Sequence, residues 1–261
     1  MTILEKITAA KLLRVERAKT NVAFAQLKKS PFYLKTPRSL RSSLLDPQKN
    51  GIIAEFKKRS PSKGWLNPTA LPAAVARGYE AARVSAISVL TEQDFFAGND
   101  QDLIDVVETV NIPVLRKDFI VDSYQIFEAK AIGADVILLI AAILSKEKVS
   151  TFSRLAKELG LEVLLEVHTV EELDSCLTSG IDVVGVNNRN LIDFSVNTDT
   201  SYTIAPLIPT DFLKVSESGI SNPVVINSLK EAGFNGFLIG EAFMREPDPV
   251  LAIKTFTDTL F

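Results

Sequence analysis

A carboxylate and an ammonium group, Glu55 and Lys57, stand two residues apart at the end of the apolar stretch 52–56. Alternate side chains of a β-strand point to the same face, so this spacing would place the two groups side by side. Side chains of these two types can exchange protons with a substrate. The alternative is an edge strand carrying a solvated surface ion pair, which would contribute little to stability. The positions of the other charged residues favour the first interpretation.

Comparable polar residues follow several other apolar runs of the chain. If those runs are strands of one barrel, the groups at their carboxyl ends converge on one mouth, where barrel enzymes hold their catalytic residues. Carboxylates and ammonium groups gathered over an apolar floor are costly unless they are used. The further polar strand ends are Arg116, Lys117 and Asp118, then Glu166, then Asn187, Asn188 and Arg189, then Glu217, Ser218 and Gly219, and finally Gly240 and Glu241.

One repeated pattern positions these groups from Gly51 onward. Each unit is a short Val, Ile and Leu run, then polar residues, then an amphipathic segment, which is typical of parallel strands buried on both faces and joined by helices. About eight such units favour a single closed (β/α)8 barrel of the α/β class over two doubly wound domains. The predicted strands are residues 52–56, 86–90, 113–115, 136–140, 163–167, 183–186, 212–215 and 236–239.

The first part of the chain precedes this pattern. Apolar residues at near-helical spacing predict a helix over 3–28, and residues 39–45 predict a short second helix. We therefore expect an N-terminal helical extension, residues 1–48, that packs on a barrel domain formed by residues 49–261. Within the barrel, helices are predicted over 145–159 and 222–232, each with an N-cap residue at its start and a glycine after its end.

Two glycine-containing turns follow the last two predicted strands. Ser218 and Gly219 stand at the first turn, and Gly240 and Glu241 stand at the second. Glycine lets ligand oxygens approach backbone N–H groups, and (β/α)8 barrels often bind phosphate after these two strands. The alternative is that both glycines only make tight turns. Their occurrence on two adjacent strands favours a phosphate site.

Composition argues against several classes of function. The 261-residue chain has a formal net charge of −3 and a pI of about 5.4, so it has no overall basic field to attract nucleic acid or an anionic membrane. One cysteine, Cys176, and one histidine, His168, provide neither a disulfide framework nor a metal-ligand set. Because the sequence has no apolar leader and no apolar run of membrane length, we expect a cytoplasmic protein. We also expect that it uses no metal and no cofactor.

These residues lie in motifs that resemble the indole-3-glycerol phosphate synthase family, the (β/α)8 enzymes of the tryptophan pathway. The resemblance covers nearly the whole chain and rests on many motifs in the same order. They are ILEKI at 3–7, IAEFK at 53–57, SPSKG at 60–64, SVLT at 88–91, FAG at 96–98, LRKDFIVD at 115–122, LEVH at 165–168, GVNNRNL at 185–191, SESGI at 216–220 and LIGEAFM at 238–244.

The resemblance implies that 1-(2-carboxyphenylamino)-1-deoxyribulose 5-phosphate closes to an indole and loses carbon dioxide and water. Lys117 matches the family lysine that donates a proton to the carbonyl oxygen during ring closure. Glu55 and Glu166 match catalytic glutamates, and nearby carboxylates should keep Lys117 charged. Lys57 matches the lysine that positions the substrate carboxylate. The sequence does not assign each proton in the later dehydration to one residue.

Binding residues are implied by the same motifs. Arg189 presents a planar fork for an anion, and Asn187 can hydrogen-bond a sugar hydroxyl. The segment 60–64, which begins at Ser60, would form a mobile lid over the mouth. Because a carboxylate beside a phosphate is unfavourable, the Glu241 side chain is expected to turn away. The aromatic ring of the substrate would be contacted by Phe96, Phe119 and Trp65. The phosphate would be contacted by Ser218 and by the backbone of Gly219, Gly240 and Glu241.

The expected partner is therefore a small phosphorylated substrate, with neither nucleic acid nor a membrane, and the sequence is compatible with a monomer. Three alternatives remain open. A phosphoribosylanthranilate isomerase would use a cysteine at the first strand end, where this chain has Glu55 and Lys57. A Schiff-base aldolase would use Lys117, and a phosphate-binding barrel would have lost its activity. His168 is expected to be structural or solvent-facing, and Cys176 to be a small core residue.

Overall fold

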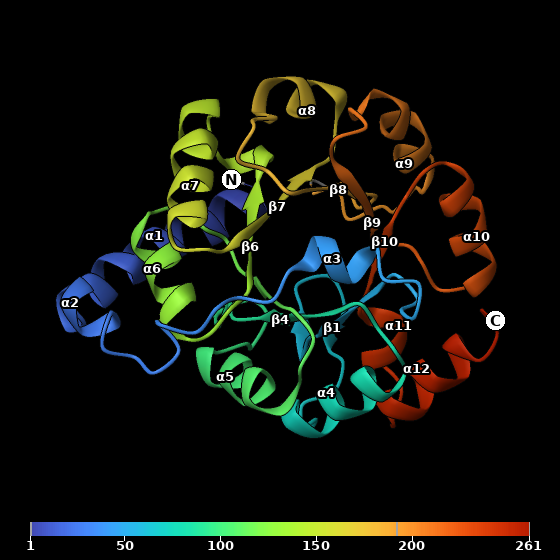
Figure 1. The fold of residues 1–261 in the computed structure, drawn as a ribbon, viewed down its shortest axis with the longest axis horizontal. Helices are drawn as coiled ribbons and strands as arrows, with labels where there is room; N and C mark the ends of the chain where they lie inside the picture. The colour runs from blue at the N-terminus through green and yellow to red at the C-terminus, as the bar shows by residue number, and fades with distance from the viewer. Residues whose placement is uncertain (1, 192, 261) are drawn as a thin grey trace.

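Eight parallel strands form a closed barrel, and helices surround it (Figure 1). The computed structural model describes residues 2–191 and 193–260. The barrel strands are β1 (Ile52–Phe56), β4 (Ala86–Leu90), β5 (Val114–Lys117), β6 (Val136–Ile140), β7 (Glu162–Val167), β8 (Val183–Asn187), β9 (Leu213–Glu217) and β10 (Gly236–Ile239). The ring closes at β1, where Ile53 pairs with Ala86 of β4 and Ile52 pairs with Phe237 of β10. This confirms the predicted (β/α)8 barrel.

The strands could be predicted because both of their faces are buried. Helices cover the outer face, and the packed barrel interior covers the inner face. Every residue of β1, β4 and β6 is buried, so these strands appear in the sequence as unbroken apolar runs. Two strands end two residues later than their apolar runs indicate. β5 continues to Lys117, which pairs with Leu90, and β9 continues to Glu217, which pairs with Asn187. The charged ends of these two strands are therefore held by the hydrogen-bonded ladder.

Helices cover the outside of the ring (Figure 1). The Ser145 hydroxyl accepts the Lys148 N–H at the start of α7, and Asn222 accepts the Val224 N–H at the start of α10, as the sequence predicts. Cys176 ends α8 and is buried, which confirms its expected place in the core. These outer elements are α4 (Pro72–Ala81), α5 (Asp100–Thr109), α6 (Tyr124–Ala131), η1 (Ala141–Ile143), α7 (Lys146–Glu158), α8 (Val170–Cys176), α9 (Asp199–Ile204), η2 (Ala205–Leu207), α10 (Pro223–Glu231), α11 (Glu241–Met244) and α12 (Pro249–Thr257).

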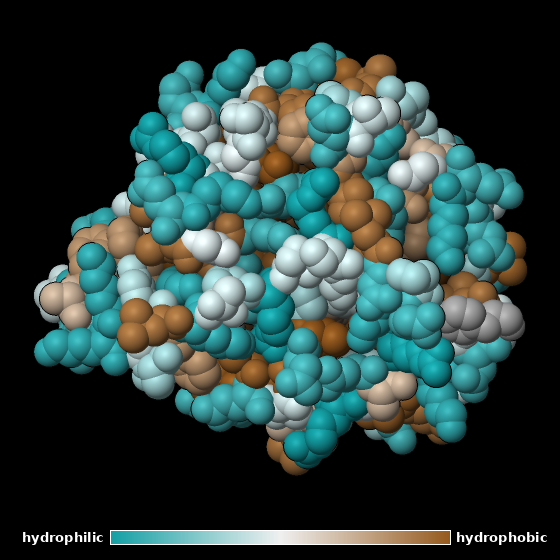
Figure 2. All heavy atoms as spheres, in the orientation of Figure 1, coloured by the Kyte–Doolittle hydropathy of each residue, from teal (hydrophilic) through white to brown (hydrophobic). Residues whose placement is uncertain are grey.

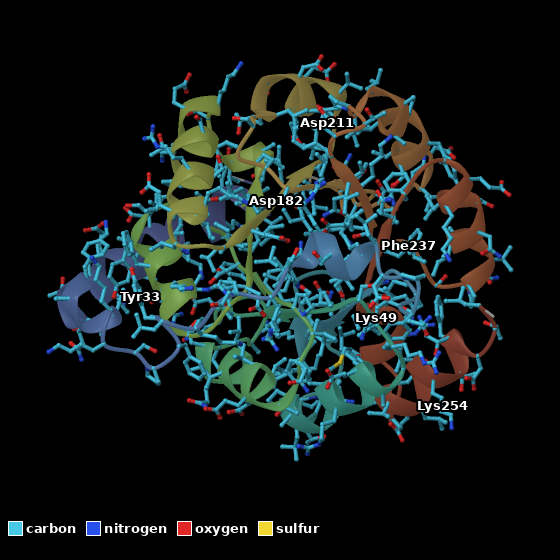
Figure 3. All side chains as sticks on the ribbon, in the orientation of Figure 1. Tyr33, Lys49, Asp182, Asp211, Phe237 and Lys254 are labelled. Carbon is cyan, nitrogen blue, oxygen red and sulfur yellow. The ribbon has the colours of Figure 1, made fainter. Side chains whose placement is uncertain are left out.

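A short helix closes the amino end of the barrel. α3 (Leu40–Leu44) inserts Leu40 and Leu44 into the interior cluster that includes Ile53, Ala86 and Val136. Ala86 and Val136 begin their strands, so this contact lies where the strands begin. α3 lies across the centre of the ring in Figure 1, and Figure 3 shows side chains filling that interior. The barrel is therefore a packed core, with α3 as its plug.

The helix predicted over 3–28 is two helices. α1 (Ile3–Asn21) ends at Val22, which is extended, and α2 (Phe24–Leu27) follows. The break has a tertiary cause. The Tyr124 hydroxyl donates to the backbone oxygen of Val22 at 2.9 Å, and Phe24 packs edge to face on Tyr124 and Phe127 of α6. These contacts favour a turn of the chain that the local helical spacing does not reveal.

The segment before β1 reaches both ends of the barrel. α3 plugs the amino end, whereas Ile3, Leu4 and Ile7 of α1 line a cavity at the carboxyl end.

Hydrophilic residues cover most of the face that Figure 2 shows, with apolar residues in small separate groups. In the part of the chain that the structure describes, no helix has the length and apolar character needed to cross a membrane.

Candidate active site

A cavity of about 790 Å³ opens at the carboxyl end of the barrel, and every strand of the barrel contributes to its lining. This is the end at which (β/α)8 enzymes hold their catalytic groups. The site residues predicted from the sequence lie on its wall, with the exception of Trp65. They are Glu55, Lys57, Ser60, Phe96, Lys117, Phe119, Glu166, Asn187, Arg189, Ser218, Gly219, Gly240 and Glu241.

Lys117 lies between two carboxylates at the floor of this cavity. Its Nζ is 2.6 Å from Glu166 Oε2 and 3.2 Å from Glu217 Oε2, and all three side chains are nearly buried. They come from β5, β7 and β9, so the closure of the barrel brings together residues that lie far apart in sequence. Glu166 was predicted as a partner of Lys117, whereas Glu217 was noted only as a polar strand end. The position of Glu217 directly before Ser218 and Gly219 was the signal that could have placed it in the site.

A second ion pair stands at the carboxyl end of β1. Lys57 Nζ lies 2.5 Å from Glu55 Oε1, which confirms that the two side chains share one face. Both are largely buried, so the interpretation as a solvated surface ion pair is wrong.

Two glycines leave the space that these carboxylates occupy. A Cβ at Gly185 of β8 would lie 2.2 Å from Glu217 Oε1, and a Cβ at Gly240 would lie 2.5 Å from Glu55 Oε1. Any larger residue at either position would displace a carboxylate from the cavity floor. Gly240 was predicted for its backbone N–H alone, and the structure gives it this second steric role.

Burial and mutual charge shift the pKa values of the three ionisable groups at the cavity floor in different directions. Burial lowers the pKa of Lys117, but the neighbouring carboxylates of Glu166, Glu217 and Glu55 outweigh it and raise that pKa. Burial opposes ionisation of Glu166, yet Lys117 and His168 lower the pKa of Glu166 to about 2. Burial raises the pKa of Glu217 to about 7, with the negative charge of Glu166 as a further cause. At neutral pH Lys117 is therefore an ammonium, Glu166 an anion, and Glu217 a group able to take or release a proton.

Polar groups from β8 and β9 form the side wall. The Ser218 hydroxyl donates to Asn187 Oδ1 at 2.9 Å, and the same oxygen accepts the Arg189 N–H at 3.0 Å. Ser218 has a φ of +66°, a left-handed conformation that a non-glycine residue rarely adopts and that clusters at functional sites. The Arg189 guanidinium lies 3.5 Å from Glu241 Oε2, so both side chains face the same part of the cavity. The expectation that the Glu241 side chain turns away from a bound phosphate stays a prediction.

Apolar side chains form the opposite wall. The Phe96 and Phe119 rings lie 6.0 Å apart and are tilted by 36°, and both line the cavity. Trp65 does not join them, contrary to the expectation from the sequence. It is 57% exposed and packs against the Arg59 guanidinium, because it lies in β3 (Gly64–Trp65), a strand of the hairpin above the barrel.

The predicted lid segment has secondary structure of its own. β2 (Arg59–Ser60) pairs antiparallel with β3, and residues 60–63 line the cavity. Lys58 anchors the hairpin through an ion pair to Asp102 of α5 at 2.8 Å. This hairpin was not expected from the sequence, since strands of two residues leave no periodic pattern. Whether the segment moves as a lid stays a prediction.

His168, predicted to be structural or solvent-facing, is largely buried beside the site. It follows β7 and faces Glu166 on one side and Glu172 on the other, with a side chain only 10% exposed. It is therefore not solvent-facing. Among the described residues, no group of three or more His, Cys, Asp or Glu side chains is arranged to hold a metal ion.

A closed barrel whose carboxyl-end cavity holds a charged lysine between an ionised and a titratable carboxylate defines a (β/α)8 enzyme that moves protons on a small polar substrate. Known proteins give the particular family. The family model described as indole-3-glycerol phosphate synthase matches residues 4–256. The chain belongs to this family.

Individual relatives agree with this assignment. The indole-3-glycerol phosphate synthase of Bacteroides thetaiotaomicron is 45% identical to this chain over 254 residues, which cover 97% of each of the two chains. That of Desulfotalea psychrophila is 46% identical over 248 residues, which cover 93% of this chain and 94% of the relative. Among solved structures, tryptophan synthase subunit alpha from Legionella pneumophila superposes with a TM-score of 0.62 at 12% identity, over 85% of this chain and 95% of that chain. This last likeness concerns the fold alone.

Proposed function

We propose that this chain carries out the reaction for which its family is named, the synthesis of indole-3-glycerol phosphate. The substrate would be 1-(2-carboxyphenylamino)-1-deoxyribulose 5-phosphate, which closes its ring and loses carbon dioxide and water. The observation that carries this proposal is the position of Lys117 between Glu166 and Glu217 on the cavity floor. A charged lysine in a buried cavity is placed to donate a proton to a carbonyl oxygen as a carbon nucleophile attacks the carbonyl carbon.

The first chemical step uses this lysine. As the aromatic carbon bonds to the carbonyl carbon, the C=O electron pair moves to oxygen, which takes a proton from Lys117 Nζ. The neutral amine formed lies between two carboxylates and regains a proton from the group best able to release one near neutral pH, which is Glu217. Positive charge develops on the anilino nitrogen at the same time. The anion of Glu166, with Glu55 beside Lys57, would stabilise that charge.

The remaining predicted residues would bind the two anionic ends of the substrate. Lys57 would position the aromatic carboxylate, with Ser60 of the hairpin above it and Phe96 and Phe119 against the ring. When that carboxylate leaves as carbon dioxide, the electrons of its bond to the ring restore the aromatic ring and the neutral anilino nitrogen. The hydroxyl formed at the former carbonyl carbon then takes a proton and leaves as water, and the neighbouring CH2 carbon loses a proton, so that the indole double bond forms.

The phosphate would lie at the opposite end, near the turns after β9 and β10. There Ser218 and the backbone N–H groups of Gly219, Gly240 and Glu241 would bind it, with Arg189 beside them and Asn187 toward the sugar.

The raised pKa of Lys117 argues against the Schiff-base alternative. A lysine that attacks a carbonyl must be a neutral amine, whereas carboxylates surround Lys117 and favour its charged form. The isomerase alternative fails for another reason, because Cys176 is buried in α8 and the end of β1 holds Glu55 and Lys57.

We further propose that residues 1–48 form an extension of one barrel domain, 49–261, and that the chain works in the cytoplasm without nucleic acid, membrane or cofactor, in a form that can be a monomer. Sedimentation at assay concentration tests the last point.

The decisive experiment is a product assay. Purified chain is mixed with the carboxyphenylamino substrate, and indole fluorescence and released carbon dioxide are followed together. Equal amounts of indole product and carbon dioxide are expected. Stable binding of substrate with neither product would instead favour a phosphate-binding barrel, and a borohydride-trapped adduct on Lys117 would favour the aldolase.

A further inference from the structure

His168 lies behind the cavity wall in a fixed orientation. Glu172 of α8 holds it from outside, since one oxygen, Oε2, accepts the His168 backbone N–H at 2.7 Å and lies 3.2 Å from Nδ1. The side chain is only 10% exposed. Because Nδ1 faces Glu172, the other ring nitrogen must face inward.

That inner nitrogen is directed at Glu166. His168 Nε2 lies 3.5 Å from Glu166 Oε1, and it is a buried atom without a hydrogen-bond partner in the described part of the chain. The other oxygen of the same carboxylate, Oε2, is 2.6 Å from Lys117. The two oxygens of Glu166 thus face two different nitrogen bases, one inside the cavity and one behind its wall.

Three carboxylates act on the charge of His168. They are Glu166 on β7, Glu172 on α8, and Glu217 on β9, while the ammonium of Lys117 lies on the other side of Glu166. Burial lowers the pKa of His168, but its hydrogen bond to Glu172 and these three carboxylates outweigh that effect and raise the pKa above its usual value. The surroundings therefore favour the imidazolium form of the ring, in which each nitrogen carries a proton.

We infer that His168 is a positioning residue for the proposed reaction: its imidazolium holds Oε1 of Glu166 from behind, so that Oε2 stays against Lys117. This inference rests on the proposed function, in which Glu166 and Lys117 act as a pair. His168 is not among the residues that line the cavity, so it would not contact a bound substrate. Its effect should therefore appear in kcat, while KM for the substrate changes little.

The arrangement predicts a specific pH dependence. When His168 loses its proton, Glu166 loses one of its two cationic neighbours and is freer to turn away from Lys117. The kcat therefore decreases as pH rises through the pKa of His168, which lies above the usual histidine value. Lys117 itself loses its proton only at higher pH, because its pKa is raised above the usual lysine value.

The kinetic test compares four variants with the wild type. His168→Gln keeps a side-chain N–H but does not titrate, so the part of the decrease of kcat that follows His168 disappears, whereas the part that follows Glu217 stays. Glu172→Gln keeps the imidazole ring of His168 but removes one carboxylate beside it. The pKa of His168 therefore falls, and the decrease of kcat that follows it moves to lower pH. His168→Leu removes the donor, and kcat falls by roughly tenfold or more at neutral pH. Glu171→Gln is the matched control, since this neighbouring side chain on α8 is fully exposed, and its profile should match the wild type.

A second readout does not depend on activity. The chain has one histidine, so the ring proton signals in its NMR spectrum report His168 alone. Its pKa should fall in Glu172→Gln and in Glu166→Gln and stay unchanged in Glu171→Gln, because coupling between two groups is reciprocal. An unchanged His168 pKa in Glu166→Gln, or a pH profile of kcat in His168→Gln that is identical to the wild type, would overturn the inference. If the chain makes no indole product, the proposed function fails by itself, and the NMR result still decides whether His168 and Glu166 interact.

Discussion

Lys117 is the residue at which chemistry can be separated from binding. In Lys117→Met the side chain keeps much of its length but cannot donate a proton, so we expect kcat to fall by about 10²- to 10⁴-fold, the usual contribution of general acid catalysis. Substrate affinity should change much less, because binding is proposed to rest on Lys57, Arg189 and the turns after β9 and β10. Steady-state kinetics and equilibrium binding test this, with Lys148→Met on the exposed face of α7 as control. Near wild-type turnover would remove Lys117 from the mechanism.

Glu217 gives a second prediction, on stability. A glutamate normally titrates near 4.5, but burial raises the pKa of Glu217 to about 7, so between these pH values the folded state binds more protons than the unfolded state. Stability then falls as pH rises through this window, the opposite of the direction for Glu166, whose pKa is lowered. Glu217→Gln carries no titratable group at this position. The unfolding free energy of the wild type relative to this variant should therefore decrease by about 3 kcal/mol from pH 4.5 to pH 8.

Chemical denaturation at both pH values measures this difference. A constant difference would mean that Glu217 titrates at its ordinary value, and the proton-return step through Glu217 would lose its support.

At the scale of single elements, sequence patterns located the strands well and their ends less well. A parallel strand buried on both faces is an unbroken apolar run, which is why residues 52–56 and 136–140 were predicted with their observed bounds. Lys117 and Glu217 are strand residues only because Leu90 and Asn187 pair with them, and no local pattern contains that pairing. The break after α1 and the hairpin of β2 and β3 likewise depend on contacts distant in sequence.

α1 is the element whose contribution to binding can be isolated. Its ion pairs hold it on the segment after Lys117: Lys11 lies 2.7 Å from Asp118 and Lys19 lies 2.7 Å from Asp122. Its first turn presents Ile3 and Leu4 to the cavity, each half-buried. A combined Ile3→Ser and Leu4→Ser variant should raise KM by roughly tenfold, because apolar contacts of this size contribute on the order of 1 to 3 kcal/mol.

Leu12→Ser with Leu13→Ser is the matched control, since those two side chains are 46% and 65% exposed on the same helix. Equal KM values in both double variants would make α1 purely structural. Deletion of residues 1–45 would be a poorer test, because it also removes α3.

At the scale of the whole molecule, the barrel separates stability from function along its axis. The amino end is closed by α3 with apolar side chains, whereas the carboxyl end gathers the charges that the chemistry requires. The sequence predicted the second half of this division, because charged residues at the ends of apolar runs are visible one by one. It did not predict the plug, since Leu40 and Leu44 form an ordinary helical pattern and nothing local shows that their partners are Ile53 and Val136.

The plug gives the last prediction. Leu40 is fully buried among the first residues of the strands, so Leu40→Ala should lower the unfolding free energy by about 2 to 5 kcal/mol through lost burial and a cavity. The kcat and KM of the protein that remains folded should match the wild type, because Leu40 lies at the end of the barrel opposite to Lys117. Denaturant titration and kinetics at a temperature well below unfolding measure the two effects separately. Leu45→Ala, next to α3 and 58% exposed, is the control and should change stability by less than about 0.5 kcal/mol. A large loss of kcat in folded Leu40→Ala would instead mean that strain at the amino end is transmitted along the strands to the carboxylates around Lys117, and the two ends of the barrel would not be independent.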